Sequence, residues 1–196
     1  MKMFKKLMAV ALAGVMALAV LTGCGSSVNE KEVIAIVNDA VKATVAGVVG
    51  EVTGEEKEIT FKAADSELKD KTKAVAGIVE EKIGEKDTID TILKGKKEAI
   101  LDALAGKDRK DTNMYLVSYA TKVKYDSKLF NTLNDGINAL EIAQKIGTNK
   151  VVHVSTEIRN YEAKGTGMMA FQDVTVNGKT YTIVVMKVDM QKKATK

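Results

Sequence analysis

The hydrophobic pattern of this chain changes its period near residue 113, and this change constrains the fold more than any other feature. Before that point apolar side chains recur at the three- and four-residue spacing of helices, and after it they alternate as in strands. Helical segments that precede a run of strands are typical of the α+β class. We therefore expect N-terminal helices packed on a C-terminal, mostly antiparallel sheet of about four strands.

Three helices are predicted before residue 113. They span residues 30–49, 66–83 and 87–106. Asn29 is expected to cap the first helix and Asp87 the third, and Gly50 is expected to end the first. The 196-residue sequence contains no proline, which suits long helices because proline interrupts their hydrogen bonds. Residues 51–64 fit either a small hairpin or a loop.

The segment 114–125 has the period of a strand. Its alternation places Tyr115, Tyr119 and Tyr125 on one face, with Ser118 among the polar side chains of the other. A helix over 126–147 follows, and then a strand whose core face carries Val152, Val154, Thr156 and Ile158. Lys164 to Gly167 is predicted to form a turn.

Asn177-Gly178 is the strongest hairpin signal in the sequence, because both residues tolerate the positive φ of a primed two-residue turn. It predicts strands at 168–176 and 179–189. The register would pair Val176 with Lys179, Val174 with Tyr181, and Phe171 with Val184. Residues 183–186 are apolar on both faces, so the last strand is expected to lie in the middle of the sheet.

This order of elements resembles the cystatin-like and nuclear-transport-factor-like cone folds. The resemblance concerns topology alone and implies no function. The length fits a single α+β domain over 29–190, followed by a basic tail at 191–196.

The N-terminus has the pattern of an export signal. Lys2, Lys5 and Lys6 precede an uncharged run over 7–21, which is shorter than the ~20 apolar residues of a membrane span. The next residues resemble the bacterial lipobox: Leu21, Thr22, Gly23 and then Cys24, which is the only cysteine.

The lipobox resemblance implies a signal peptide over 1–23 and a diacylglycerol group on the Cys24 thiol. The mature protein would then be anchored to the cell membrane on its extracytoplasmic face by a short tether, 24–28. Two or more acyl chains give stable attachment. Gly25 carries no retention charge, so an outer membrane is the alternative location in a cell that has one.

Charge argues against a nucleic-acid partner. Three of the 30 basic residues lie in the predicted signal, so the remaining chain has 27 basic and 26 acidic residues. This near balance gives no overall basic surface. Lys187, Lys192, Lys193 and Lys196 could contact anionic lipid or a cell-wall polymer, or could simply keep the C-terminus solvated.

The sequence contains no motif for an activated nucleophile, a metal or a cofactor. Its one histidine, His153, would face outward on a strand, about 7 Å from Ser155 and too far for a Ser–His pair. Aromatic side chains offer one candidate for a ligand-facing surface. Its members are Tyr115, Tyr119, Tyr125 and Tyr181.

The alternatives for these tyrosines, and for the methionines of the strands, are ordinary core packing and a cuprous-ion site. We expect a non-catalytic lipoprotein of the cell envelope that binds an envelope protein, a cell-wall polymer or a small ligand. The alternative is an envelope hydrolase that uses Asp/Glu acid–base chemistry, because carboxylates brought together by folding leave no local motif.

Overall fold

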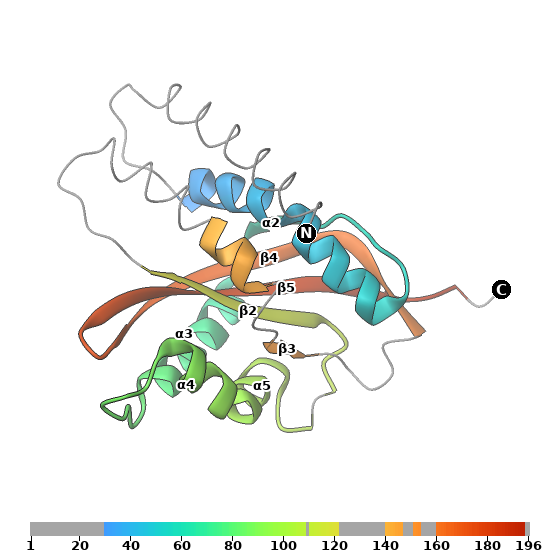
Figure 1. The fold of residues 1–196 in the computed structure, drawn as a ribbon. Helices are drawn as coiled ribbons and strands as arrows, with labels where there is room; N and C mark the ends of the chain where they lie inside the picture. The colour runs from blue at the N-terminus through green and yellow to red at the C-terminus, as the bar shows by residue number, and fades with distance from the viewer. Residues whose placement is uncertain (1–29, 109, 122–139, 147–150, 154–159, 195–196) are drawn as a thin grey trace, which may run out of the picture.

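A computed structural model describes residues 30–108, 110–121, 140–146, 151–153 and 160–194 (Figure 1). The predicted signal peptide, lipobox, Asn29 cap and tether lie outside these residues, as do the end of the predicted strand 114–125 after Thr121, most of the helix over 126–147, and the strand beyond His153. So do the last two residues of the predicted basic tail. The side chains of 151–153 are not described either.

The α+β prediction is confirmed. The described elements form five strands and helices on both sides of them (Figure 1). The helices are α2 (Glu30–Thr53), α3 (Ser66–Glu80), α4 (Ile89–Gly95) and α5 (Lys97–Ala105). Residues 140–146 are also helical. The strands are β1 (Thr60–Ala63), β2 (Met114–Thr121), β3 (Val151–His153), β4 (Tyr161–Val176) and β5 (Lys179–Lys192).

The strand order is β1-β4-β5-β2-β3, which puts β5 in the middle as predicted. The β4–β5 hairpin has the predicted register, with Val176 opposite Lys179, Val174 opposite Tyr181 and Phe171 opposite Val184. Its turn has φ of 48° at Asn177 and 76° at Gly178, the positive values that a primed turn requires.

The prediction that every strand follows residue 113 is wrong. β1 comes from the ambiguous segment 51–64 and pairs in parallel with β4 at one edge of the sheet. Both backbone polar groups of its Phe61 form hydrogen bonds with a side chain of α2. The Asn38 side-chain amide donates to Phe61 O at 2.7 Å and accepts from Phe61 N at 2.8 Å. Asn38 thus occupies backbone groups that an edge strand would otherwise offer to another chain.

The predicted turn at Lys164 to Gly167 is also wrong. These residues lie within β4, where the pairing with β5 shifts register between Ala163 and Gly167. The glycines permit this irregularity: Gly165 has φ of 85°, and Gly167 lies close against Phe61. A glycine pair inside a strand therefore marks a bulge here and not a chain reversal.

The helix boundaries differ from prediction for local reasons. α2 passes Gly50 and ends before Gly54, whose φ of 83° suits a glycine after a helix. α3 ends at Glu80, three residues before its predicted end. The predicted third helix is divided at Lys96, whose Nζ donates to Ile78 O at 2.7 Å and to Glu81 O at the end of α3.

The prediction that Asp87 caps the third helical segment is wrong. Thr88 caps α4 through a capping box with Thr91. The predicted cap, Asp87, instead accepts a hydrogen bond from Gly84 N at 2.7 Å.

Two apolar clusters lie on opposite faces of the sheet. One joins the sheet to α2 and residues 140–146, and the other joins it to α3, α4 and α5, as the arrangement in Figure 1 shows. β2 is buried on both faces, so the prediction of a polar face there is wrong for the described part of the strand. Ser118 is 1% exposed, and its hydroxyl donates to Ile142 O.

Within the described residues, the segment Val33–Thr53 of α2 is long and apolar enough to cross a membrane by length and composition. Half of its most apolar window is buried inside the fold. Val37, Val41, Val45 and Val49 are each at most 2% exposed in the cluster on that face. The apolar character of α2 is therefore accounted for, at least in part, by packing on the sheet.

Replacement of Gly167 by Ala should lower the free energy of unfolding by about 1–3 kcal/mol. A Cβ at this position would lie 2.5 Å from the Lys187 carbonyl oxygen and 2.7 Å from the Phe61 ring. Gly77→Ala is the control, because nothing lies within 4 Å of a Cβ there; it should stabilise α3 by about 0.5–1 kcal/mol. Urea unfolding measures both, and a Gly167→Ala protein as stable as the parent would contradict the close approach.

Candidate functional site

The tyrosine face predicted from sequence is covered by helices. Tyr115 is 0% exposed and Tyr119 is 3% exposed, and both belong to the cluster beneath α3, α4 and α5. Tyr181 is half-buried at its margin, and its ring meets that of Tyr119 edge to face at 5.8 Å. Tyr125 lies outside the described residues. A ligand could reach the rings of Tyr115 and Tyr119 only by displacing the structure over them.

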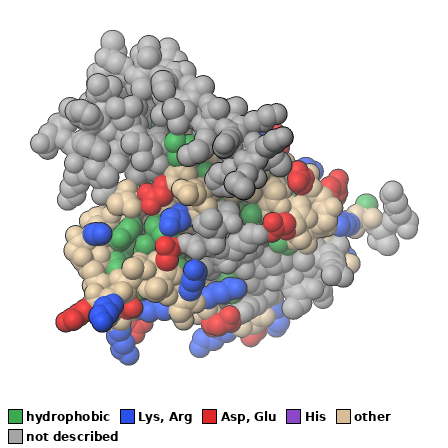
Figure 2. Space-filling view, in the orientation of Figure 1, with side chains coloured by type: hydrophobic (Ala, Val, Ile, Leu, Met, Phe, Trp, Pro, Cys, Tyr) green, Lys and Arg blue, Asp and Glu red, His purple; other side chains and the backbone are tan. Residues whose placement is uncertain are grey.

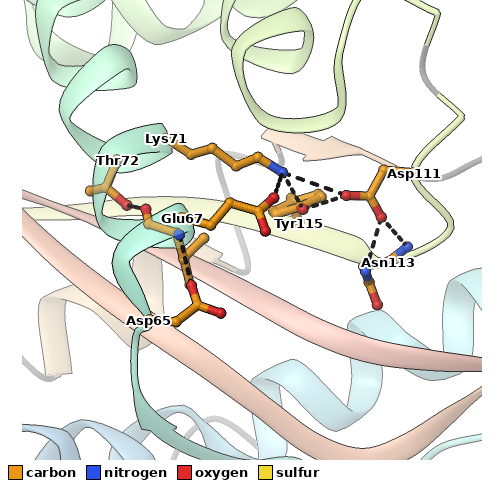
Figure 3. A network of polar contacts seen from close by, with 8 residues as sticks. Asp65, Glu67, Lys71, Thr72, Asp111, Asn113 and Tyr115 are labelled. Carbon is orange, nitrogen blue, oxygen red and sulfur yellow. Dashed lines mark hydrogen bonds and ion pairs between the residues drawn. The ribbon is translucent and has the colours of Figure 1, made fainter.

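Several polar side chains surround the hydroxyl of Tyr115 on this face (Figure 3). That hydroxyl donates to Asp111 Oδ2 at 2.6 Å and accepts from Lys71 Nζ at 3.0 Å. Lys71 also pairs with Glu67 at 2.9 Å and with Asp111 at 3.6 Å. We call Glu67, Lys71, Asp111 and Tyr115 the Lys71 network.

Local structure positions each member of the Lys71 network. Glu67 and Lys71 are one turn apart on α3, which begins at an Asp65 cap that accepts from Leu68 N at 2.9 Å. Asp111 Oδ1 accepts from both the backbone and side-chain nitrogens of Asn113 at 2.9 Å, which fixes the chain just before β2. The network therefore joins α3, the segment that enters β2, and β2 itself.

The electrostatics of the network keep Tyr115, Asp111 and Lys71 in their ordinary charge states. Burial raises the pKa of the Tyr115 hydroxyl, and its hydrogen bond to Asp111 raises it further. Burial opposes ionisation of Asp111, but hydrogen bonds from Tyr115 and Asn113 prevail and lower its pKa. Burial likewise opposes the charge on Lys71, yet its bonds to Glu67 and Tyr115 raise its pKa. At neutral pH the network holds a neutral phenol, a carboxylate and an ammonium.

A second group with similar chemistry surrounds Tyr119. Lys145 Nζ lies 4.9 Å from the centre of the Tyr119 ring and 3.3 Å from Asp90 Oδ2 on α4. Burial and a hydrogen bond to Asp90 raise the pKa of the Tyr119 hydroxyl. Glu141, near Lys145 in sequence, accepts from Thr121 N at 2.8 Å.

This second group connects the two layers of helices. The helical residues 140–146 place Ile142, Ala143 and Ile146 in the cluster on the α2 side, whereas Lys145 reaches Tyr119 and α4 on the other side. The segment therefore lies beside the part of β2 that follows its pairing with β3, where Ser118 bonds to Ile142 and Thr121 to Glu141.

The side chains of these two groups whose pKa is shifted do not have the charge states of three common catalytic roles. A general acid needs a carboxyl that stays protonated near neutral pH, and Asp111 is shifted the opposite way. A lysine nucleophile needs a lowered pKa, and the pKa of Lys71 is raised. Tyr115 and Tyr119 are held protonated, so neither is a ready base. Both groups join separate elements of the fold.

The sequence also pointed to the strand methionines, His153 and the lipobox. Among the described residues, no group of three or more His, Cys, Asp or Glu side chains could hold a metal ion. Met114, Met169 and Met186 lie in the cluster on the α2 side, whereas Met168 lies in the opposite cluster, so these four do not converge. The backbone of His153 pairs with Tyr115 of β2, and its predicted outward side chain lies outside the description. The described residues also exclude the lipobox, Leu21, Thr22, Gly23 and Cys24.

The surface in view carries both signs of charge. Figure 2 shows basic and acidic side chains interspersed over the lower part of the molecule, as expected from the near balance of charges in the chain. On this face no large region of a single sign is present among the described residues. Mixed surfaces of this kind favour solubility and do not attract a polyanion strongly.

Comparison of the chain with family models, with curated proteins and with solved structures finds no match.

Sequence reasoning did not predict the Lys71 network. Lys71 and Tyr115 are 44 residues apart, so no local spacing connects them. The one available signal was Asp111 and Asn113 immediately before a strand, a pair typical of a side-chain-to-backbone turn.

Asp111→Asn should lower the free energy of unfolding by about 1–2 kcal/mol at neutral pH, because hydrogen bonds to a carboxylate become bonds to a neutral amide. Folding lowers the pKa of Asp111. Its contribution is therefore complete above the unfolded-state pKa of about 3.9 and is lost as pH falls through the lower folded-state value.

The measurement is urea unfolding of both proteins from neutral pH to about pH 2. The matched control is Asp70→Asn, since Asp70 is exposed on α3 and pairs with Lys73 at 3.7 Å; it should change stability little. A gap between Asp111→Asn and the parent that stays constant across this pH range would show that the Asp111 carboxylate is not preferentially stabilised by folding.

Proposed function

We propose that this protein is a lipid-anchored lipoprotein of the bacterial cell envelope whose mature domain binds a partner and performs no catalysis. The observation that carries the proposal is the sequence Leu21-Thr22-Gly23-Cys24 after a basic and then uncharged N-terminus. In this proposal Cys24 carries the lipid, and the domain lies on the extracytoplasmic side of the membrane.

The length of the tether supports a position close to the membrane. Only five residues separate Cys24 from Glu30, where α2 begins. A fully extended chain advances at most about 3.6 Å per residue, so the start of α2 lies within roughly 20 Å of the anchored cysteine. The proposed partner is therefore an envelope protein or a cell-wall polymer within reach of a domain held at the surface.

The buried state of the tyrosine face supports a binding role that uses the outer surface. Tyr115 and Tyr119 are part of the core, and they also belong to the Lys71 network and to the group around Lys145, respectively. The charge states of the Lys71 network favour a structural role for its ionisable side chains. A partner would then be recognised by exposed side chains of the folded domain.

One observation favours the second candidate, an envelope hydrolase with Asp/Glu acid–base chemistry. The Glu67 and Asp111 carboxylates contact the same Lys71 ammonium, at 2.9 and 3.6 Å, so they are close enough for a pair of catalytic acids. The lowered pKa of Asp111 disfavours it as a proton donor. Turnover of a cell-wall substrate by the purified protein, lost in Asp111→Asn, would establish the hydrolase instead.

Cys24→Ala should abolish incorporation of a labelled fatty acid and prevent maturation at the lipobox. The variant should leave the membrane fraction, or stay there only as a larger, uncleaved precursor. Ser26→Ala is the control, because it alters the tether and keeps the lipobox. Labelled Cys24→Ala of mature size in the membrane pellet would refute the anchor. Unchanged fractionation of Ser26→Ala is expected in either case.

A further inference from the structure

The tip of the β4–β5 hairpin is attached to the loop between α3 and α4 by one side chain. The Asn177 amide nitrogen donates to Asp87 O at 2.8 Å, Gly84 O at 3.1 Å and Glu85 O at 3.3 Å. We call this contact the Asn177 clasp. Beside it, Thr175 N donates to the Glu80 carboxylate at 2.8 Å.

The backbone on both sides of the clasp has unusual conformations. Among the described residues, the non-glycine residues with positive φ are Lys82, at 50°, and Asn177, at 48°. One lies at the end of α3 and the other at the hairpin tip, so the loop and the turn that meet at the clasp each hold a residue in a sparsely populated region. The Asn177 clasp joins these two segments.

Asn177 is followed by Gly178, and this dipeptide has a chemistry of its own. The Gly178 backbone nitrogen can attack the Asn177 side-chain carbonyl carbon, forming a C–N bond and a cyclic imide. The amide nitrogen leaves as ammonia with the proton of the Gly178 N–H. Water then opens the ring to give an aspartate or an isoaspartate, and nothing is oxidised or reduced. Glycine permits this ring closure because it has no side chain to obstruct the approach.

We propose that Asn177 is a deamidation site that the clasp protects and whose reaction permanently opens the clasp. While its nitrogen is held by three carbonyl oxygens, the Asn177 side chain is not free to rotate toward Gly178 N. Once the loop detaches, the reaction can proceed. The aspartate product places a carboxylate, which donates no hydrogen bond, opposite three carbonyl oxygens. The repulsion keeps the α3–α4 loop away from the hairpin.

The first test compares the rate of deamidation in folded and unfolded chains. The purified full chain is incubated in mildly alkaline buffer, with and without urea, and Asn177 is followed by peptide mapping and mass spectrometry. We expect the folded chain to react at least about tenfold more slowly, because reaction requires local opening. Equal rates in the two states would overturn the protective role of the clasp.

A second test weakens the loop and leaves Asn177 in place. Asp87→Ala removes the carboxylate that accepts from Gly84 N at 2.7 Å, and it should speed deamidation of the folded chain. Asp108→Ala is the control, because this exposed side chain pairs with Lys110 away from the clasp. If Asp87→Ala does not fold, Glu80→Ala removes the α3 carboxylate that accepts from Thr175 N of the hairpin, beside the clasp. A folded loop variant that reacts no faster than the control would refute the proposal.

A third test examines the product. Asn177→Asp should lower the midpoint of thermal unfolding more than Asn177→Gly. Glycine accepts the φ of this turn position and loses only the hydrogen bonds, whereas aspartate adds a charge that faces the carbonyl oxygens. Equal stability of the two variants would show that the deamidated form does not hold the loop away.

Discussion

Burial of β5 on both faces is the constraint on which the rest of the structure depends. Ile183, Val184, Val185 and Met186 are all 0% exposed, although successive side chains of a strand point to opposite faces. A central strand of this kind is stable only when apolar layers cover both faces of the sheet. α2 with residues 140–146 supplies one layer, and α3, α4 and α5 supply the other. The helices before residue 113 therefore do not form a separate bundle; they divide between the two faces.

This division explains what the sequence could and could not predict. The period of β2 and β5, and the register that Asn177-Gly178 imposes, are local properties, and the structure confirms the hairpin pairing. β1 has four residues and pairs with a strand that lies about a hundred positions later, with Thr60 opposite Thr166. No local period indicates such a contact. The bulge at Gly165 and Gly167 was interpreted as a turn because glycine serves both structures.

The candidate site shows the same limit. Tyrosines on a strand could be identified from their spacing, but the Lys71 network depends on a lysine of α3 and an aspartate of the segment before β2. Buried tyrosines need partners for their hydroxyl groups. The Tyr115 hydroxyl is bonded to Lys71 and Asp111 and the Tyr119 hydroxyl to Asp90, while Lys145 lies over the Tyr119 ring. The repeated combination of tyrosine, lysine and aspartate is therefore explained by the packing of an amphipathic ring beneath helices, without a ligand.

The use of polar side chains inside the fold also limits which residues of such a domain could bind a partner at a membrane. Its two lysine-centred groups and the Asn38 bridge to β1 use polar side chains to join helices to the sheet. Side chains committed in this way cannot also bind a partner without loosening the fold. In the proposed binding role, recognition would therefore depend on residues outside these groups, on the mixed-charge surface. Interactions between exposed charges are weak individually and screened by salt. A lipid on Cys24 would offset that weakness, because confinement to a surface raises the effective concentration of the domain near an envelope partner and lets modest contacts suffice.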